Sequence, residues 1–423
     1  MRTIRTVQLC AVILITSSLS LAGSAKKFEW TTDSKEAKQL LFDVQMRVEN
    51  FQFGNEIIEA ARKVVEADPE FAMGEYYLSA VMPPPDNQAH LDRAVELSKK
   101  ASDGERRFID AMVLIRADNG ANFEAGIPLL EKLASDYPDE RLVYVILGQL
   151  YQGTGENEKA LTTYRKAQRI GPKSNRLRAF IANDDLAKGR YAEARQSYEK
   201  IEEDLPEGAA PFQIRYGTAV SYLYEKEVDK SLAVLEQSVT EYTESGANQN
   251  FPEVFIWNMI ARVNLENGRL EAAMKGYQKG YECVPGSTLP DDQKEVWLGR
   301  LHHGKCRVLA KMGKYEEAWA QAETVRKMIE EGGEEGEQYL PAYHYLVGYL
   351  KLEEGDYKTA LKHIEQADLT DPFMQLLLAR AYEGLGEKEK AREAYEQVVG
   401  SSGAGLPRAL SYPEAKEKLG TGS

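Results

Sequence analysis

Cysteine is scarce in this chain, with three residues among 423. Cys10 lies in the amino-terminal segment, so Cys283 and Cys306 are the two that remain for the rest of the protein. An oxidising compartment would permit a disulfide between them. In the repeat pattern described below, however, they lie about two helical turns out of step, which is roughly 10 Å and beyond disulfide reach. We therefore expect two small buried thiols.

Positive charge is also in short supply. The chain has 53 Lys and Arg against 67 Asp and Glu, a formal net charge of −14, and loss of Arg2 and Arg5 with a leader would make it −16. Such acidity argues against nucleic-acid binding, which depends on Lys and Arg neutralising phosphates. Acidic surfaces also keep proteins soluble, so the charge identifies no partner by itself. The 43% hydrophobic and 28% charged content fits a soluble folded protein.

Long apolar runs are missing except near the start. Arg2 and Arg5 precede an apolar stretch at 7–22, and small residues follow at 22–25, which is the pattern of a signal peptide. Its strictly apolar core, 9–15, is too short for a bilayer span, which needs roughly 20 residues. We expect a signal peptide at 1–25 and a periplasmic or extracellular protein without a membrane span after processing. An uncleaved anchor is the alternative. Ser24 stands where a lipoprotein would carry its lipid-bearing Cys, so no lipoprotein is expected.

Catalytic and metal-binding motifs are lacking too. There is no serine-elbow pattern, HExxH or CxxC. Residues 299–306 fit the phosphate-loop pattern GxxxxGK, but Cys306 replaces the required hydroxyl and the segment falls where a helix is expected. His302 and Cys306 share one helical face, yet zinc needs about four converging ligands. His302 occupies the same repeat position as His344, which favours packing. We expect no enzyme, no metal and no cofactor.

What the sequence does contain is a 34-residue period. Segments 107–140, 141–174 and 175–208 follow each other in one register. A fixed period of this size indicates stacked supersecondary units. Within each unit, apolar residues recur three to four positions apart, as on one face of a helix. The clearest unit carries Tyr144, Leu147, Gly148, Tyr151, Gly155, Ala160, Tyr164, Ala167 and Pro172.

These residues resemble the tetratricopeptide repeat family, with Tyr or His usually standing where the family has its first Trp. Weaker copies cover nearly all of the chain after residue 25, about nine units in total. The resemblance implies an all-α superhelical solenoid of stacked antiparallel helix pairs. The weaker copies are built around Leu41/Ala61, Tyr77/Ala94, Ala219/Leu235, Trp257/Ala273, His302/Ala318, His344/Ala360 and Leu378/Ala391.

The period becomes irregular downstream. Insertions at 245–252, 286–293 and 331–340 lengthen three connections, and their polar composition favours exposed loops over hinges or binding loops. The expected organisation is a signal peptide at 1–25, two divergent helix pairs at 26–106, regular units and one adjacent unit at 107–244, irregular units at 245–400, and a flexible tail at 401–423 in which 412–419 are a candidate capping helix.

The resemblance also implies where a ligand binds. In this family, first-helix residues at repeat positions 2, 5, 9 and 12 line a concave groove that takes peptides. Arginine forks suit carboxylates, and tyrosine adds stacking and a hydroxyl. The other interpretation is that these arginines pair with acidic residues of adjacent helices. The candidate peptide-binding residues are Asn258, Arg262, Arg300, His303, Arg307, Tyr345, Tyr349 and Arg380, with Phe255 beside them.

Upstream, the same positions give a more neutral, aromatic groove, formed by Arg176, Ala179, Phe180, Asn183, Gln213, Tyr216 and Val220. The family's carboxylate clamp for chaperone tails is not matched, because Asn258 lacks its partner Lys and Gly304 stands where a second Asn belongs. We expect a non-enzymatic interaction scaffold of the cell envelope that binds an extended acidic or carboxy-terminal peptide of another protein. The alternatives are a structural subunit of an envelope assembly or secretion complex that uses the convex face, and a small-ligand or glycan-binding protein.

Overall fold

The computed structural model describes residues 26–83, 86–120, 122–245, 253–287, 289, 291–401 and 404–420. The expected signal peptide at 1–25 lies outside these ranges. Every regular element in the described part is a helix. None of the helices described is both long and apolar enough to cross a membrane.

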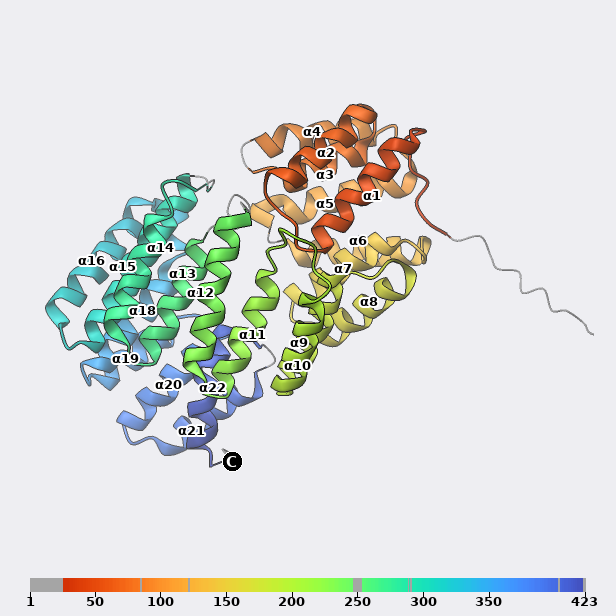
Figure 1. Ribbon diagram of the computed structural model, residues 1–423. Helices are drawn as coiled ribbons and strands as arrows, with labels where there is room; N and C mark the ends of the chain where they lie inside the picture. Colours follow the sequence, from red (N-terminus) through yellow and green to blue (C-terminus); the bar gives the residue numbers. More distant parts are fainter. Residues whose placement is uncertain are drawn as a thin grey trace, which may run out of the picture.

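The helices form antiparallel pairs, each packed on the next (Figure 1). The described part holds ten such pairs, one for each of the three regular segments and seven weaker copies named above. In order they are α1 (Lys35–Glu49) with α2 (Asn55–Ala67), α3 (Ala72–Val81) with α4 (Asp86–Ser98), α5 (Asp103–Gly120) with α6 (Phe123–Asp136), α7 (Arg141–Gly153) with α8 (Asn157–Ile170), α9 (Asn175–Ala187) with α10 (Tyr191–Glu202), α11 (Phe212–Tyr224) with α12 (Val228–Ser245), α13 (Val254–Glu266) with α14 (Leu270–Glu282), α15 (Asp291–Lys311) with α16 (Tyr315–Glu331), α18 (Leu340–Glu353) with α19 (Tyr357–Ile364), and α20 (Pro372–Gly384) with α21 (Lys388–Gly400). A short helix, α17 (Gly333–Glu337), and a last unpaired helix, α22 (Leu406–Lys418), complete the fold.

The pair α7–α8 shows why the repeat folds as predicted. The apolar stripe of α7 is buried, including Leu147 and Tyr151, and so are Ala160 and Tyr164 of α8. Gly155 closes the turn between the two helices with a φ of 79°, a conformation that costs glycine little. Left-handed glycines stand at the same turn in five later pairs, at 189, 268, 313, 355 and 386. The turn chemistry therefore repeats along with the apolar stripe.

Glycines in the first helices let tyrosines of the second helices approach the backbone. A Cβ on Gly148 would overlap the Tyr164 ring. A Cβ on Gly304 would lie 2.6 Å from Cδ1 of Tyr277, in the preceding pair. Both rings are almost wholly buried. Gly148, one of the repeat residues, thus makes a close small–large contact with Tyr164.

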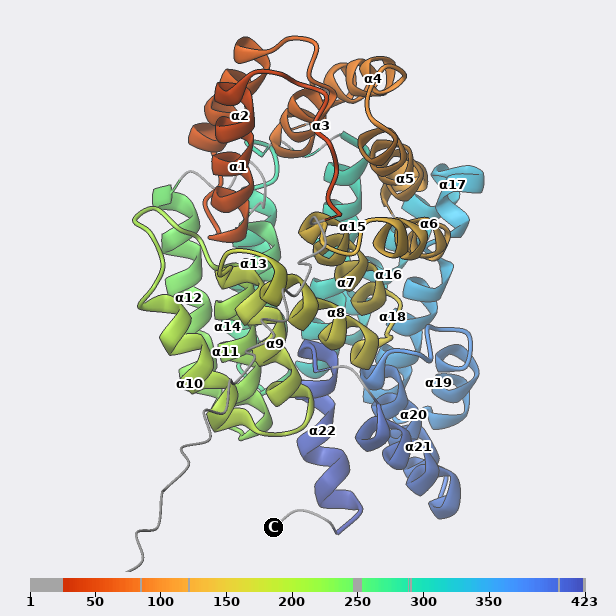
Figure 2. The ribbon, with the colours of Figure 1, turned by 90° about the vertical axis from the view of Figure 1, so that its right-hand side faces the viewer.

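The array curves so that its carboxy-terminal end returns to its middle. Figure 2 shows α22 between α11 on one side and α20 and α21 on the other. Helix α22 also touches α13. Leu406 and Ala409 of α22 belong to the apolar core built by α9–α13, whereas Ala415 belongs to the core of α18–α21. One helix therefore joins two parts of the solenoid.

Three segments differ from the sequence-based expectation. The connection at 331–340 is largely helical, because α16 runs to Glu331 and α17 follows. The connection at 286–293 is shortened, since α15 begins at Asp291. The tail holds a longer helix than expected: Pro407 occupies its first turn, where proline is favoured. The third insertion, 245–252, lies almost entirely outside the described residues.

Cys283 and Cys306 are both free thiols. Cys306 is fully buried in the core between α15 and α16, as expected, whereas Cys283 is only half-buried. Burial raises the pKa of Cys306 to about 12. The Cys306 thiol therefore stays protonated at neutral pH and acts as a small apolar group.

The substitution Gly148→Ala tests the small–large contact. The added methyl group must displace the Tyr164 ring, so we expect the free energy of unfolding to fall by about 1–3 kcal/mol. The control is Gly299→Ala in α15, where the nearest atom to the new Cβ is Met328 Cε at 3.8 Å. That change should leave stability unchanged or raise it by up to about 1 kcal/mol through helix propensity. Denaturant unfolding followed by circular dichroism measures both; equal midpoints for the two variants would contradict the contact.

Candidate binding site on the inner surface

The first helices of the later pairs bring the predicted groove residues onto one surface. Helices α11, α13 and α20 are the first helices that α22 contacts across the array, so this side faces inward. The surface is narrow: the Arg262 guanidinium of α13 lies 4.9 Å from the Phe373 ring centre of α20, three pairs further along the chain. We call the face formed by α11, α13, α15, α18 and α20 the inner surface. All eight candidate residues come from four of these helices.

Arg307 of α15 is an interior residue. Its Nη1 donates to Tyr345 Oη at 2.7 Å and its Nη2 donates to Tyr277 Oη at 2.9 Å. Its Nη1 also lies 3.7 Å from Glu266 Oε1, and only 6% of the residue is exposed. Tyr349 is buried as well, and its hydroxyl donates to Glu266 at 3.4 Å. Arg307 and Tyr349 therefore serve an internal polar cluster.

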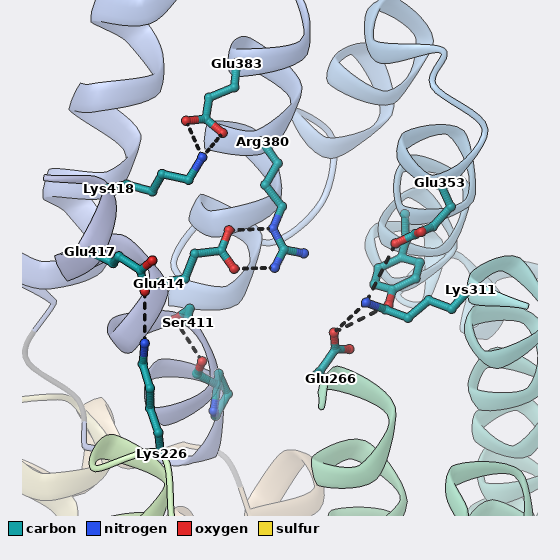
Figure 3. Close-up of polar contacts among 12 residues, drawn as sticks. Lys226, Glu266, Lys311, Glu353, Arg380, Glu383, Ser411, Glu414, Glu417 and Lys418 are labelled. Atoms are coloured by element: carbon teal, nitrogen blue, oxygen red, sulfur yellow. Dashed lines mark hydrogen bonds and ion pairs between the residues drawn. The ribbon is translucent and has the colours of Figure 1, made fainter. Parts of the chain in front are cut away.

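Lys311 extends this cluster. Its Nζ lies 3.9 Å from Glu266 Oε2 and 3.9 Å from Glu353 Oε1, and Figure 3 shows it between the two carboxylates. Two cations, Arg307 and Lys311, thus face two anions. Such a balanced set satisfies charges that would be costly to bury alone. For Arg307, the interpretation of pairing with acidic neighbours is the one that the geometry supports.

Arg380 of α20 is engaged too, but by a helix that the sequence reading had not placed here. Its Nε and Nη2 donate to Glu414 of α22 at 2.9 Å and 2.5 Å, in a two-pronged contact that Figure 3 shows. Burial raises the pKa of Glu414, but the Arg380 fork outweighs this and holds the pKa below its usual range. The carboxylate therefore stays ionised at neutral pH, and the pair is charged.

His303 contributes no positive charge at neutral pH. Burial, together with the nearby Arg307, lowers the pKa of its imidazole well below 6.5. Its Nε2 lies 3.2 Å from the carbonyl oxygen of Ala342, and its ring packs 4.9 Å from that of Tyr345. The expectation that His303 offers charge is corrected, because solvent is largely excluded and neighbouring cations oppose its protonation.

Arg262 and Arg300 are the cations of this set for which no carboxylate of the described residues lies within 4 Å. Arg262 Nε and Nη2 are shielded from solvent and donate to no acceptor among those residues. Arg300 is exposed, and its guanidinium lies 4.8 Å from the Trp297 ring centre. Phe255 packs edge-on against Trp297 at 4.7 Å. We call Phe255, Arg262, Trp297 and Arg300 the basic–aromatic patch.

Asn258 lies beside this patch but is partly committed. Its Nδ2 donates to the carbonyl oxygen of Val254 in its own helix at 2.9 Å. One N–H of the Asn258 amide is therefore not available to a ligand, although Asn258 was predicted to bind one. Of the eight candidates, Arg262 and Arg300 are therefore the cations for which the described residues offer no carboxylate partner.

A separate cavity of about 320 Å³ lies upstream of the inner surface, lined mainly by α7, α8 and α9. Phe180, Asn183 and Tyr216, all predicted for the neutral groove, line it. The Phe180 ring stacks on that of Tyr164 with centres 4.7 Å apart. Ala404 and Gly405, just before α22, form another part of its wall. Sequence reasoning missed this contribution, because it comes from more than 180 residues downstream.

The other motifs behave as packing elements. Residues 299–306 lie inside α15, so their backbone amides are committed to the helix. His302 Nδ1 lies 2.8 Å from Gln321 Oε1, and His344 Nδ1 lies 3.0 Å from His363 Nδ1. In the described part of the chain, no group of three or more His, Cys, Asp or Glu side chains is arranged to hold a metal.

Arg307→Met tests the internal cluster. The change leaves Glu266 buried without its main cation, and breaking such a pair costs about 3–5 kcal/mol. We expect Arg307→Met/Glu266→Gln to recover part of that loss, because the neutral amide needs no counter-charge. Arg392→Met, on exposed α21 surface, should change the free energy of unfolding by less than about 0.5 kcal/mol. Denaturant unfolding gives all three values, and a double variant less stable than Arg307→Met would contradict the pairing.

Comparison with known proteins supports the fold. Residues 115–175 and 374–403 each match a model of the tetratricopeptide repeat. A search of the curated proteins found no match. Among solved structures, a signal transduction ATPase with a tetratricopeptide repeat sensor, from Pyrococcus horikoshii, is similar with a TM-score of 0.51 and 12% identity, over 86% of this chain and 63% of that chain.

Two further structures give lower scores. Human IFIT1 has a TM-score of 0.47 and 16% identity, over 87% of this chain and 95% of that chain. A tetratricopeptide repeat protein from Parabacteroides merdae has a TM-score of 0.45 and 15% identity, over 66% of this chain and 98% of that chain. The two matched segments coincide with the end of α5 to α9 and with α20–α21. Tetratricopeptide repeats are therefore present at residues 115–175 and 374–403, within ten stacked helix pairs of the described residues.

Proposed function

We propose that this protein is a non-enzymatic scaffold that binds an extended acidic segment of a partner protein on its inner surface. Arg262 and Arg300 supply the charge, while Phe255, which is exposed and packs on the buried Trp297, supplies apolar contact. The pattern at residues 1–25 supports a place in the cell envelope, in the periplasm or outside the cell. The net charge of −14 disfavours nucleic acid as the ligand.

The state of Arg262 is the observation that carries the proposal. A buried donor without an acceptor costs about 1–3 kcal/mol, and native structures leave few such groups. Two of the guanidinium nitrogens of Arg262 are in this position. A carboxylate from a partner would satisfy both in the two-pronged geometry that arginine favours. Because both nitrogens are shielded from solvent, the Arg262 side chain must turn away from the Phe373 ring to receive it. Arg300 is exposed nearby to take a second carboxylate.

Arg307 fits this proposal in a different role. Because its guanidinium is enclosed by tyrosines and Glu266, it stiffens the surface from behind, and its charge is balanced inside the cluster. A charge reversal at Arg307 would damage the fold and confuse any binding test. The informative changes are therefore confined to Arg262 and Arg300.

The test compares capture of partners from envelope extract by three forms of the protein. The variant Arg262→Glu/Arg300→Glu reverses the patch. The matched control Arg62→Glu/Arg392→Glu makes the same charge change on the outer helices α2 and α21, where the two side chains are 46% and 68% exposed. We expect a partner that the parent and the control capture and the patch variant loses.

The affinity for that partner's acidic segment should fall at least 30-fold for each arginine removed, since truncating a well-packed contact costs about 2 kcal/mol or more. Fluorescence anisotropy with a labelled acidic peptide measures this. If the patch variant captures the same proteins as the parent, the inner-surface site is wrong. If the outer-helix control alone loses them, the protein is instead a structural subunit that binds through its convex face.

A further inference from the structure

The amino-terminal half of α22 is held by tyrosines of α11. The backbone nitrogen of Leu406 donates to Tyr216 Oη at 2.7 Å. Arg408 donates to Tyr224 Oη at 3.3 Å, and its guanidinium lies over the rings of Tyr224 and Tyr412 at 5.5 Å and 4.4 Å. These contacts are hydroxyl hydrogen bonds and cation–π contacts, which are polar and directional.

The carboxy-terminal half of α22 is held by ion pairs on two sides. Besides the Glu414–Arg380 pair, Lys418 Nζ lies 2.8 Å from Glu383 of α20, and Glu417 accepts from Lys226, beside α11, at 2.9 Å. Figure 3 shows all three pairs. Their side chains are between 31% and 73% exposed. Exposed pairs of this kind contribute little each and weaken in salt.

Large apolar side chains take a minor part in holding α22. Its buried residues are Leu406, Arg408, Ala409, Ser411 and Ala415, of which only Leu406 is a large hydrophobe. Leu410 and Tyr412 add partly buried contact. The Ser411 hydroxyl donates to carbonyl oxygens of α22 itself. Apolar burial is what usually fixes a helix in a core. Polar contacts therefore hold α22 to a larger extent than they hold an ordinary core helix.

The sequence that connects α21 to α22 is compatible with release of α22. Residues 400–405 read Gly-Ser-Ser-Gly-Ala-Gly and contain no large side chain. Departure of α22 would release the Arg380 fork and uncover Tyr216 and Tyr224. It would also remove Ala404 and Gly405 from the wall of the 320 Å³ cavity.

We propose that α22 is a replaceable occupant of a helix-binding seat on α11 and α20. The partner it makes way for is an amphipathic helix that presents a carboxylate to Arg380, as Glu414 does now. This inference goes beyond the acidic-segment site, and it depends on Tyr216, Tyr224 and Arg380 instead of Arg262 and Arg300. Either proposal can therefore fail alone.

The test uses the full chain with a protease site built into residues 401–403 and cut after folding. A fluorescein-labelled peptide of residues 404–420 is then added, and anisotropy follows its exchange with the cut segment. We expect exchange within minutes at 0.1 M salt and at least fivefold faster exchange at 0.5 M salt. The body should keep its far-ultraviolet circular dichroism apart from the share of one helix. No exchange over hours, or unfolding as the segment leaves, would show that α22 is a fixed part of the core.

Two matched changes test the partner chemistry. Arg380→Gln in the cut chain should weaken binding of the labelled peptide about tenfold, whereas Arg392→Gln on the outer surface should not change it. A peptide with Glu414→Lys and Glu417→Lys should fail to displace the resident segment. Equal displacement by this peptide would overturn the requirement for a carboxylate.

The uncut chain provides an independent readout. Ala415→Cys, at a fully buried position, is made in a Cys283→Ser/Cys306→Ala background, and its reaction with a soluble thiol reagent is timed. We expect the labelled peptide to accelerate the reaction at least tenfold. A rate that the peptide leaves unchanged would overturn the proposal even if cutting perturbs the fold.

Discussion

The approach of a tyrosine ring to a glycine on a neighbouring helix sets the geometry on which the other features depend. At Gly148–Tyr164 and Gly304–Tyr277, any side chain on the glycine would push the helices apart. The first contact lies within one pair and the second joins two successive pairs, and in a repeat array a small rotation per pair accumulates along the chain. The accumulated rotation brings α13 opposite α20, where Arg262 meets Phe373. A narrow inner surface is thus a long-range result of a local packing contact.

Because the inner surface is narrow, its arginines are partly removed from water. An arginine on an open concave face would be solvated, but here several cations lose most of their water and need partners from the protein. Arg307 finds Glu266 and the tyrosines, and Arg380 finds Glu414. Arg262 and Arg300 are left over, because no acidic residue is described within 4 Å of either guanidinium. In a protein with an excess of acidic residues, this local surplus of cations stands out more than the overall charge.

Much of the fold could be predicted from the sequence, because the relevant signals are local. The 34-residue step, the apolar stripes and the turn glycines each act within one or two units, and the structure confirms the helix pairs they predicted. The repeat positions also predicted that the candidate residues share one surface. It could not separate engaged from unengaged arginines, since Arg380 and Glu414 belong to different elements and no short motif links them.

The position of α22 could not be predicted from local sequence signals either, because its contacts also join residues far apart in the chain. Tyr216 and Leu406 are 190 positions apart, and their meeting requires the summed curvature of all intervening pairs. One local signal was available: Gly405 followed by Leu406 and Pro407 is a helix start, so the helix could have been placed six residues earlier than 412. Even that placement would have indicated a cap on α21, not a return to α11.

A tethered occupant changes what binding to the inner surface requires. Few residues separate α21 from α22, and a short tether gives an effective concentration on the order of millimolar, so a free partner competes against a ligand that never diffuses away. Weak individual contacts in α22 are compatible with a well-occupied seat for that reason. A partner helix displaces α22 only if it binds the seat more tightly than α22 does. It can do so through better apolar contact than Ala409 and Ala415 provide, or through a second segment that reaches Arg262 and Arg300. The seat and the basic–aromatic patch would then act together, since a ligand that engages both gains the avidity that α22 gains from its tether.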